Sequence, residues 1–185
     1  MFSAAILAGG EARRFGGRDK SALVVDGRTI LEQQLAVLSA VATDVRVIHR
    51  EDDLVPGCGP LGGLHAALTT ARHEALFVVA CDMPYIAAPF VAHLLSFAGA
   101  ADIVVPRTER GYHPLCAVYT RACLATVASR LAERRLKMVE LIAELRTREV
   151  SADEIDRFGD HNRLLANVNT PADFTGLEAL HGHKP

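Results

Sequence analysis

Residues 3–20 read SAAILAGGEARRFGGRDK, an apolar run followed by a loop rich in glycine and in cationic side chains. Ser3 to Ala8 has the length and composition of a buried β-strand. Four glycines stand in the next nine positions, and glycine lets backbone amides approach an anion without a Cβ in the way. The cationic side chains of the loop are Arg13, Arg14, Arg18 and Lys20. The pattern predicts a polyphosphate site at the carboxyl end of the first strand.

The loop differs from the two commonest nucleotide motifs. A P-loop needs adjacent Gly and Lys followed by Ser or Thr, whereas two residues separate Gly17 from Lys20. The glycines of this loop do not have the spacing Gly-x-Gly-x-x-Gly either. The usual NTPase and dinucleotide interpretations are therefore disfavoured, and a solvated glycine turn is the structural alternative.

Strand-like and helix-like segments alternate after this loop. Thr29 and Glu32 form a capping-box pattern, and Ile30, Leu31, Leu35, Leu38 and Val41 follow at helical spacing. Further strands are expected at 45–49, 75–80, 102–106 and 115–119, a Gly/Pro loop at 57–63, and helices at 64–71, 88–98, 121–134, 137–145 and 172–180. This alternation predicts a Rossmann-like, doubly wound α/β fold with a mostly parallel sheet and helices on both faces.

The chain is expected to form a single domain. Residues 1–180 would form this domain, with the polyphosphate site in its N-terminal part, and 181–185 a tail. The net charge of −2 offers no general field for nucleic acid, and there is no polybasic membrane patch. Without an apolar run of about 18 residues, a signal peptide or a Cys-x-x-Cys pair, the sequence indicates a cytoplasmic protein with reduced thiols.

A carboxylate follows the most apolar strand of the sequence. Asp82 lies in Cys81-Asp82-Met83-Pro84, directly after the 75–80 run. A buried carboxylate needs a partner, and Mg²⁺ usually takes one or two protein carboxylates besides water and substrate phosphates. Asp82 is therefore a candidate Mg²⁺ ligand, the alternative being an Asp that caps the turn before Pro84.

These motifs together resemble the nucleotidyltransferases that include the molybdenum cofactor guanylyltransferases, the MobA family. Leu-Ala-Gly-Gly, then Arg, Gly and Asp-Lys, is similar to the family signature, and Cys-Asp-x-Pro to its metal motif. The resemblance implies that Asp82 holds the metal, that Arg14 lies near the phosphates, and that GTP contacts the remaining signature residues, Leu7, Ala8, Gly9, Gly10 and Lys20.

The run from Asp53 to Gly63 resembles the family's Asp…Gly-Pro-Leu-x-Gly loop, in which the Asp contacts guanine. A carboxylate accepts from the N1 and N2 donors of guanine together. Asp53 is the best match and Asp52 a close rival. The segment before this loop is shorter than in the family, because only residues 50–52 separate His49 from Asp53.

Two further motifs resemble the family's acceptor side. His113 lies in a His-Pro strand, and Asn167 and Asn169 lie in Asn-Val-Asn-Thr-Pro. Asn side chains offer both donors and acceptors, as a pterin ring requires. The structural alternatives are a structural histidine and a turn followed by a helix cap at Thr170-Pro171.

The resemblance implies an Mg²⁺-dependent enzyme that transfers GMP from GTP to molybdopterin, with Lys20, Arg14 and Asp82 in the catalytic site. Transient contacts with cofactor-delivering proteins or molybdoenzymes would accompany that role. The alternatives are a cytidylyltransferase for the same cofactor, another small-acceptor nucleotidyltransferase, and a nucleotide-binding partner protein without turnover. A sugar-phosphate nucleotidyltransferase is less consistent, because Thr-Arg-Leu and its proline are missing.

Overall fold

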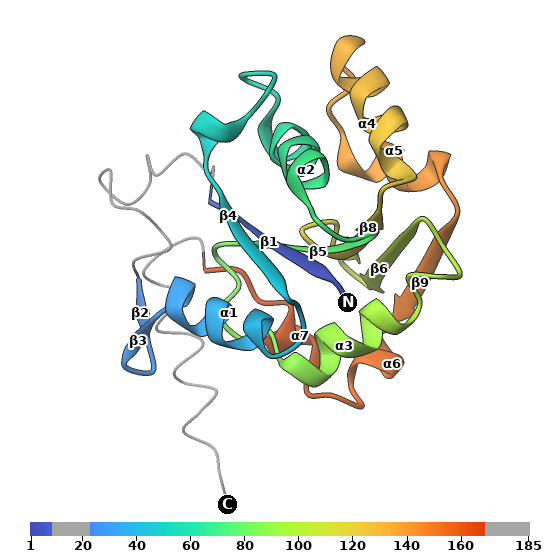
Figure 1. Ribbon diagram of the computed structural model, residues 1–185. Coiled ribbons are helices and arrows are strands. Elements are labelled where there is room, and N and C mark those ends of the chain that lie inside the picture. Colours follow the sequence, from blue (N-terminus) through green and yellow to red (C-terminus); the bar gives the residue numbers. More distant parts are fainter. Residues whose placement is uncertain (9–22, 169–185) are drawn as a thin grey trace, which may run out of the picture.

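The computed structural model describes residues 1–8 and 23–168, and its centre is a seven-stranded sheet between two layers of helices (Figure 1). The order is β4-β1-β5-β8-β6-β7, and β9 also pairs with β6. The strands of this sheet are β1 (Ser3–Leu7), β4 (Asp44–Ile48), β5 (Ala75–Ala80), β6 (Ile103–Thr108), β7 (Gly111–Tyr112), β8 (Cys116–Thr120) and β9 (Thr147–Ser151). A separate hairpin joins β2 (Val24–Val25) to β3 (Arg28–Thr29).

Most strands of the sheet run in one direction. β1 is parallel to β4 and β5, and β6 is parallel to β9. β8 lies antiparallel between β5 and β6, so β6 points the same way as β5. Only β7 and β8, among the described strands of the sheet, run the other way. The predicted α/β class with a mostly parallel sheet is confirmed.

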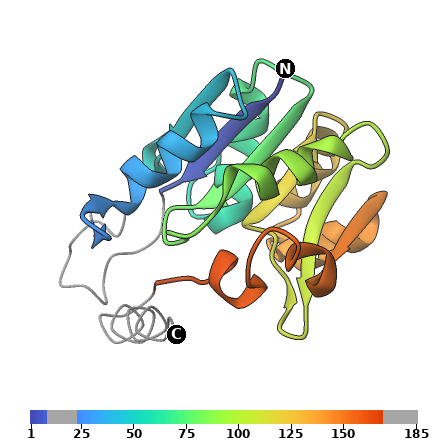
Figure 2. The ribbon, with the colours of Figure 1, turned by 90° about the horizontal axis from the view of Figure 1, so that it is seen from below.

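The helices divide between the two faces of the sheet, as Figures 1 and 2 show. α1, α3, α6 and α7 pack on one face, and α2, α4 and α5 pack on the other. Their bounds are α1 Ile30–Ser39, α2 Gly59–Thr70, α3 Ala88–Ser96, α4 Cys123–Ala132, α5 Met138–Glu144, α6 Ala152–Ile155 and α7 His161–Leu164. Among the described residues, no helix is both long and apolar enough to cross a bilayer.

Strand β1 contributes to both cores because successive side chains of a strand point to opposite faces. Ala4 and Ile6 belong to the core beneath α1 and α3. Ala5 and Leu7 belong to the core beneath α2 and α4. All four cysteines are buried thiols, as the sequence predicts.

Helix α1 begins at the predicted capping box. Thr29 Oγ1 accepts from the amide of Glu32 at 3.1 Å, and the Glu32 carboxylate accepts from the amide of Thr29 at 2.8 Å. The fully buried stripe of the helix is Ile30, Gln34 and Leu38. A glutamine thus occupies a core position, one helical turn after Ile30 and one before Leu38.

The Gly/Pro loop predicted at 57–63 is wrong in its second half, because α2 already begins at Gly59. Pro60 lies in the first turn, where a missing N–H breaks no helical hydrogen bond. Strand β9 is an addition that the sequence pattern did not predict. The helix expected at 172–180, its Thr170 cap and the tail at 181–185 lie outside the described residues.

Candidate nucleotide and metal site

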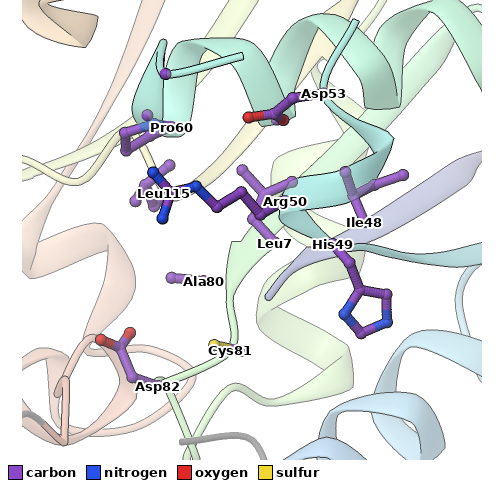
Figure 3. A pocket seen from close by; sticks show the side chains of 13 residues that line it. Leu7, Ile48, His49, Arg50, Asp53, Pro60, Ala80, Cys81, Asp82 and Leu115 are labelled. Atoms are coloured by element: carbon purple, nitrogen blue, oxygen red, sulfur yellow. The ribbon is translucent and has the colours of Figure 1, made fainter. Parts of the chain in front are cut away.

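A pocket of about 400 Å³ opens at the carboxyl ends of β1, β4 and β5 (Figure 3). Its lining comes from the ends of those strands, the turn after β4, the first turns of α2, and the residues that follow β5. These residues are Leu7, Ile48, His49, Arg50, Asp53, Gly57, Gly59, Pro60, Gly63, Ala80, Cys81, Asp82 and Leu115. Ligands of open α/β sheets bind at this edge.

The turn after β4 decides which of two neighbouring aspartates faces the pocket. Residues Arg50–Asp52 form one 3₁₀ turn, and its capping bond runs from the amide of His49 to Asp52 Oδ2 at 2.8 Å. Asp53 follows the turn and lines the pocket, whereas Asp52 lines a separate depression beside β4. Of the two aspartates that the sequence offers for the base, Asp53 is therefore the one that lines this pocket.

Asp53 is held by packing. A Cβ on Gly62 would lie 3.1 Å from Asp53 Oδ2, so a side chain at this position of α2 would displace the carboxylate by a few tenths of an ångström. Among the described residues, the Asp53 side chain accepts no hydrogen bond. Burial raises the pKa of Asp53; the charge of Arg50 opposes that rise and the charge of Asp52 adds to it.

Arg50 is a pocket residue that the motif analysis did not single out. Figure 3 shows its side chain extending across the pocket between Asp53 and Asp82. An arginine offers five N–H donors and a charge that stays positive. Arg50 was the residue directly after the predicted strand, and a cation at a strand's carboxyl end was the signal that could have found it.

Leu7 and Ala8, which the family resemblance assigns to GTP, already use part of their backbone within the fold. The amide of Ala8 donates to the carbonyl of Ile48 at 2.8 Å, and the carbonyl of Leu7 accepts from the amide of Cys81 at 3.2 Å. The side chain of Leu7 lines the pocket floor. These contacts join β1 to both neighbouring strand ends and give the pocket a continuous base.

Asp82 lies at the end of β5 and contacts a segment 85 residues away. Asn167 Nδ2 donates to Asp82 Oδ1 at 3.0 Å, and the amide of Val168 donates to the carbonyl of Asp82 at 2.8 Å. The structure thus brings together two residues that the sequence placed in separate roles, the metal carboxylate and the acceptor amide.

The side chains around Asp82 fit a hard divalent cation. The Asp82 carboxylate supplies oxygen atoms and accepts from the amide nitrogen of Asn167, and Mg²⁺ completes its shell with water and substrate phosphates. One other group in the described chain could hold an ion, formed by Asp156, Asp160 and His161. There Asp160 caps α7 and Asp156 accepts from the amide of His161, so both carboxylates already serve the local turn.

His113 does not line the pocket. Its Nε2 lies 3.0 Å from Thr108 Oγ1, and its amide donates to the carbonyl of Pro106. Burial lowers the pKa of His113, and the charge of Arg110 lowers it further. Leu115, two residues along, reaches the pocket instead.

Five predicted site residues lie outside the described part of the chain. They are Gly9, Gly10, Arg14, Lys20 and Asn169. Their roles stay predictions from the motif, and the described pocket lies where the chain leaves β1 toward them.

Comparison with known proteins gives a consistent result. The model of the MobA-like NTP transferase domain matches residues 4–149. A protein of Desulfosudis oleivorans named molybdenum cofactor guanylyltransferase is 32% identical, and the match covers 94% of this chain and 93% of the relative.

Solved structures show the same fold at lower identity. Molybdopterin-guanine dinucleotide biosynthesis protein A from Archaeoglobus fulgidus superposes with a TM-score of 0.76 at 23% identity, covering 98% of this chain and 99% of that one. 2-C-methyl-D-erythritol 4-phosphate cytidylyltransferase from Thermus thermophilus gives a TM-score of 0.70 at 19% identity, covering 99% and 100%. Because one of these acts with a cytidylyl group, the fold alone does not set the base.

Proposed function

The chain belongs to the MobA-like NTP transferase family, and from this premise we propose that it transfers GMP from GTP to molybdenum-molybdopterin, forming molybdopterin guanine dinucleotide. The observation that carries the proposal is the pocket at the strand ends, with Asp53 and Asp82 on its opposite sides (Figure 3). Its volume of about 400 Å³ is within the range of small-molecule sites.

The reaction needs no nucleophilic side chain. An oxygen of the terminal molybdopterin phosphate, already an anion, forms a bond to the α-phosphorus of GTP, and the bond from that phosphorus to the β-phosphate oxygen breaks. Pyrophosphate leaves with the electron pair. In such a transfer the protein mainly positions the reactants and neutralises charge. Lys20, Arg14 and the amides of Gly9 and Gly10 are proposed to stabilise the charge of the pyrophosphate.

Asp82, with Asn167 beside it, is the proposed holder of Mg²⁺. The bound ion would neutralise phosphate charge. Within the protein, Asn167 orients the carboxylate through its bond to Oδ1, and Val168 fixes the backbone of the same residue. The site is thereby built from the first half and the last described residues of the chain.

Asp53 is the proposed guanine-binding residue. It has unused acceptor capacity and faces the pocket, and burial makes its charge costly until donors arrive. Guanine presents N1–H and N2–H on one edge, whereas cytosine does not present this pair. Leu7 and Ala8 would form the floor beneath the nucleotide.

The acceptor side is proposed to lie in the C-terminal part of a single domain. Asn167, Asn169 and His113 are its proposed residues. Asn167 contacts Asp82, so a pterin bound there would lie beside the metal carboxylate. A cytoplasmic location and transient contacts with cofactor-delivering proteins or molybdoenzymes complete the proposal.

The test is pyrophosphate release by the purified protein with Mg²⁺, molybdenum-loaded molybdopterin and each of the four NTPs in turn. Release with GTP alone is expected, and Asp82→Asn should abolish it while leaving the circular dichroism spectrum unchanged. Release with CTP instead would refute the role of Asp53. Intact nucleotide binding without release from any NTP would favour a binding protein over an enzyme.

A further inference from the structure

Gln34 places its amide directly beneath the turn that presents Asp82. Its side chain is fully buried in α1, with 0% exposed. Gln34 Nε2 donates to the carbonyl of Ala80 at 2.8 Å and to the carbonyl of Met83 at 2.9 Å. These carbonyls stand two residues before and one residue after Asp82. One amide group therefore joins the two ends of the turn that carries the carboxylate.

Other contacts of this turn in the described part of the chain include backbone hydrogen bonds and the bond from Asn167. The amide of Met83 donates to Ala80 at 3.3 Å, a long bond, and the amide of Cys81 donates to Leu7. Gln34 supplies two shorter bonds from a different secondary-structure element. Gln34 thus links the backbone on both sides of Asp82 directly to α1.

Gln34 also imposes a cost on the core. In the described part of the chain, its Oε1 is buried without a hydrogen-bond partner. An unsatisfied buried polar atom is destabilising, and an apolar side chain of similar length would avoid the penalty. A core position that keeps a half-satisfied amide is typical of a site where geometry is maintained at the expense of stability.

We propose that Gln34 is a positioning residue, which holds the Asp82 turn in the orientation that lets the carboxylate bind a divalent cation. The proposal rests on the proposed role of Asp82 as the metal ligand. Groups that orient a ligand without touching the metal typically change its affinity by about 10–100-fold when removed. Gln34 acts here through the backbone on either side of the ligand.

The test uses Gln34→Met, which keeps the length of the side chain and removes the donor. Mn²⁺ binding is measured by electron paramagnetic resonance with a non-hydrolysable GTP analogue. The dissociation constant is expected to rise about 10-fold, the lower end for such partners. Amide hydrogen exchange should also accelerate at Met83 and Val168, whose N–H groups donate to carbonyls of the same turn.

Gln33→Met is the matched control. Gln33 is the neighbouring glutamine on α1, and its Nε2 also donates to two carbonyls, those of Val25 and Arg28 in the β2–β3 hairpin. Mn²⁺ affinity and exchange at Met83 should match the wild type in this variant. If Gln34→Met does not fold, Gln34→Asn withdraws the amide by one methylene and should weaken Mn²⁺ binding in the same direction.

Wild-type Mn²⁺ affinity and wild-type exchange in the Gln34 variants would overturn the positioning role. Asp82→Asn separates this failure from that of the metal assignment. If Asp82→Asn loses Mn²⁺ while the Gln34 variants keep it, only the positioning role is refuted. If Asp82→Asn binds Mn²⁺ as the wild type does, the metal role of Asp82 is refuted and the positioning role with it.

Discussion

Replacing Gly62 by alanine should weaken the protein's binding of GTP. In a helix interior, alanine is favoured over glycine by about 0.5–1 kcal/mol. For a chain of this size, each 1 kcal/mol of stability corresponds to a change in Tm of about 2–4 °C. The added Cβ would stand 3.1 Å from Asp53 Oδ2, 3.2 Å from Cys58 Cβ and 3.3 Å from Asp53 Cγ. The Asp53 carboxylate and the buried Cys58 must therefore shift by a few tenths of an ångström, which offsets the gain in helix propensity.

The functional magnitude follows from what Asp53 is proposed to accept. Each hydrogen bond to a charged group contributes about 1.5–3 kcal/mol, and a displacement of this size weakens such bonds without abolishing them. A loss of about 1.4 kcal/mol, or tenfold in KM for GTP, is expected. With inosine triphosphate, which lacks the 2-amino donor, the loss should be smaller.

The assay is initial-rate pyrophosphate release over a range of GTP concentrations, alongside a thermal melt. Gly62→Ala in an Asp53→Asn background is the control, since a change that acts through Asp53 should add little once that carboxylate is gone. A folded variant with wild-type KM for GTP would refute the reasoning, because the carboxylate would then have moved without consequence for the base.

Three further outcomes are expected. Asp53→Asn should raise the free energy of unfolding at pH 7, because burial raises the pKa of this acid in the folded state. The gain should vanish as the pH falls below 3.8, the ordinary pKa of an aspartate. An equal gain at every pH in urea titrations would be inconsistent with this cause. Asn167→Ala should lower kcat/KM for molybdopterin about tenfold, which corresponds to about 1.4 kcal/mol, because the bond to Asp82 is lost. A change in KM for GTP alone would argue against an acceptor role for Asn167. Arg130→Met should lower the free energy of unfolding by about 1.5–3 kcal/mol, because the guanidinium of Arg130, a residue that is 1% exposed, donates to two glutamates of α5. We expect the variant to show normal turnover and a lower urea midpoint.

The features that the sequence predicted well are local ones. A continuous apolar run such as 75–80 is typical of a strand that is buried on both faces of a parallel sheet, and β5 is found there. The capping box at Thr29 depends on residues three apart, and both of its bonds are present. The position of Asp82 after β5 followed from the same strand.

The features that it missed depend on distant parts of the chain. Whether Gln34 belongs to the core is decided by the carbonyls of Ala80 and Met83, almost fifty residues away. The bond between Asn167 and Asp82 likewise needs the whole sheet to be assembled. Strand β9 forms only because β6 offers a partner edge, since its residues Thr147–Ser151 carry little apolar alternation.

The short connection between β4 and α2 is sufficient to bring a carboxylate, the proposed base-binding Asp53, to the pocket. Asp52 closes the 3₁₀ turn by accepting from His49, so the chain reverses within a few residues and delivers Asp53 to the mouth of the pocket. Gly57 and Gly59 have φ values of +75° and +56°, which lead the chain from there into α2. Asp53 is then confined by Gly62 and lacks a donor among the described residues, so its charge raises the energy of the empty site. A ligand with two adjacent N–H groups would relieve that cost, so the proposed role of Asp53 would favour guanine over a base without this donor pair.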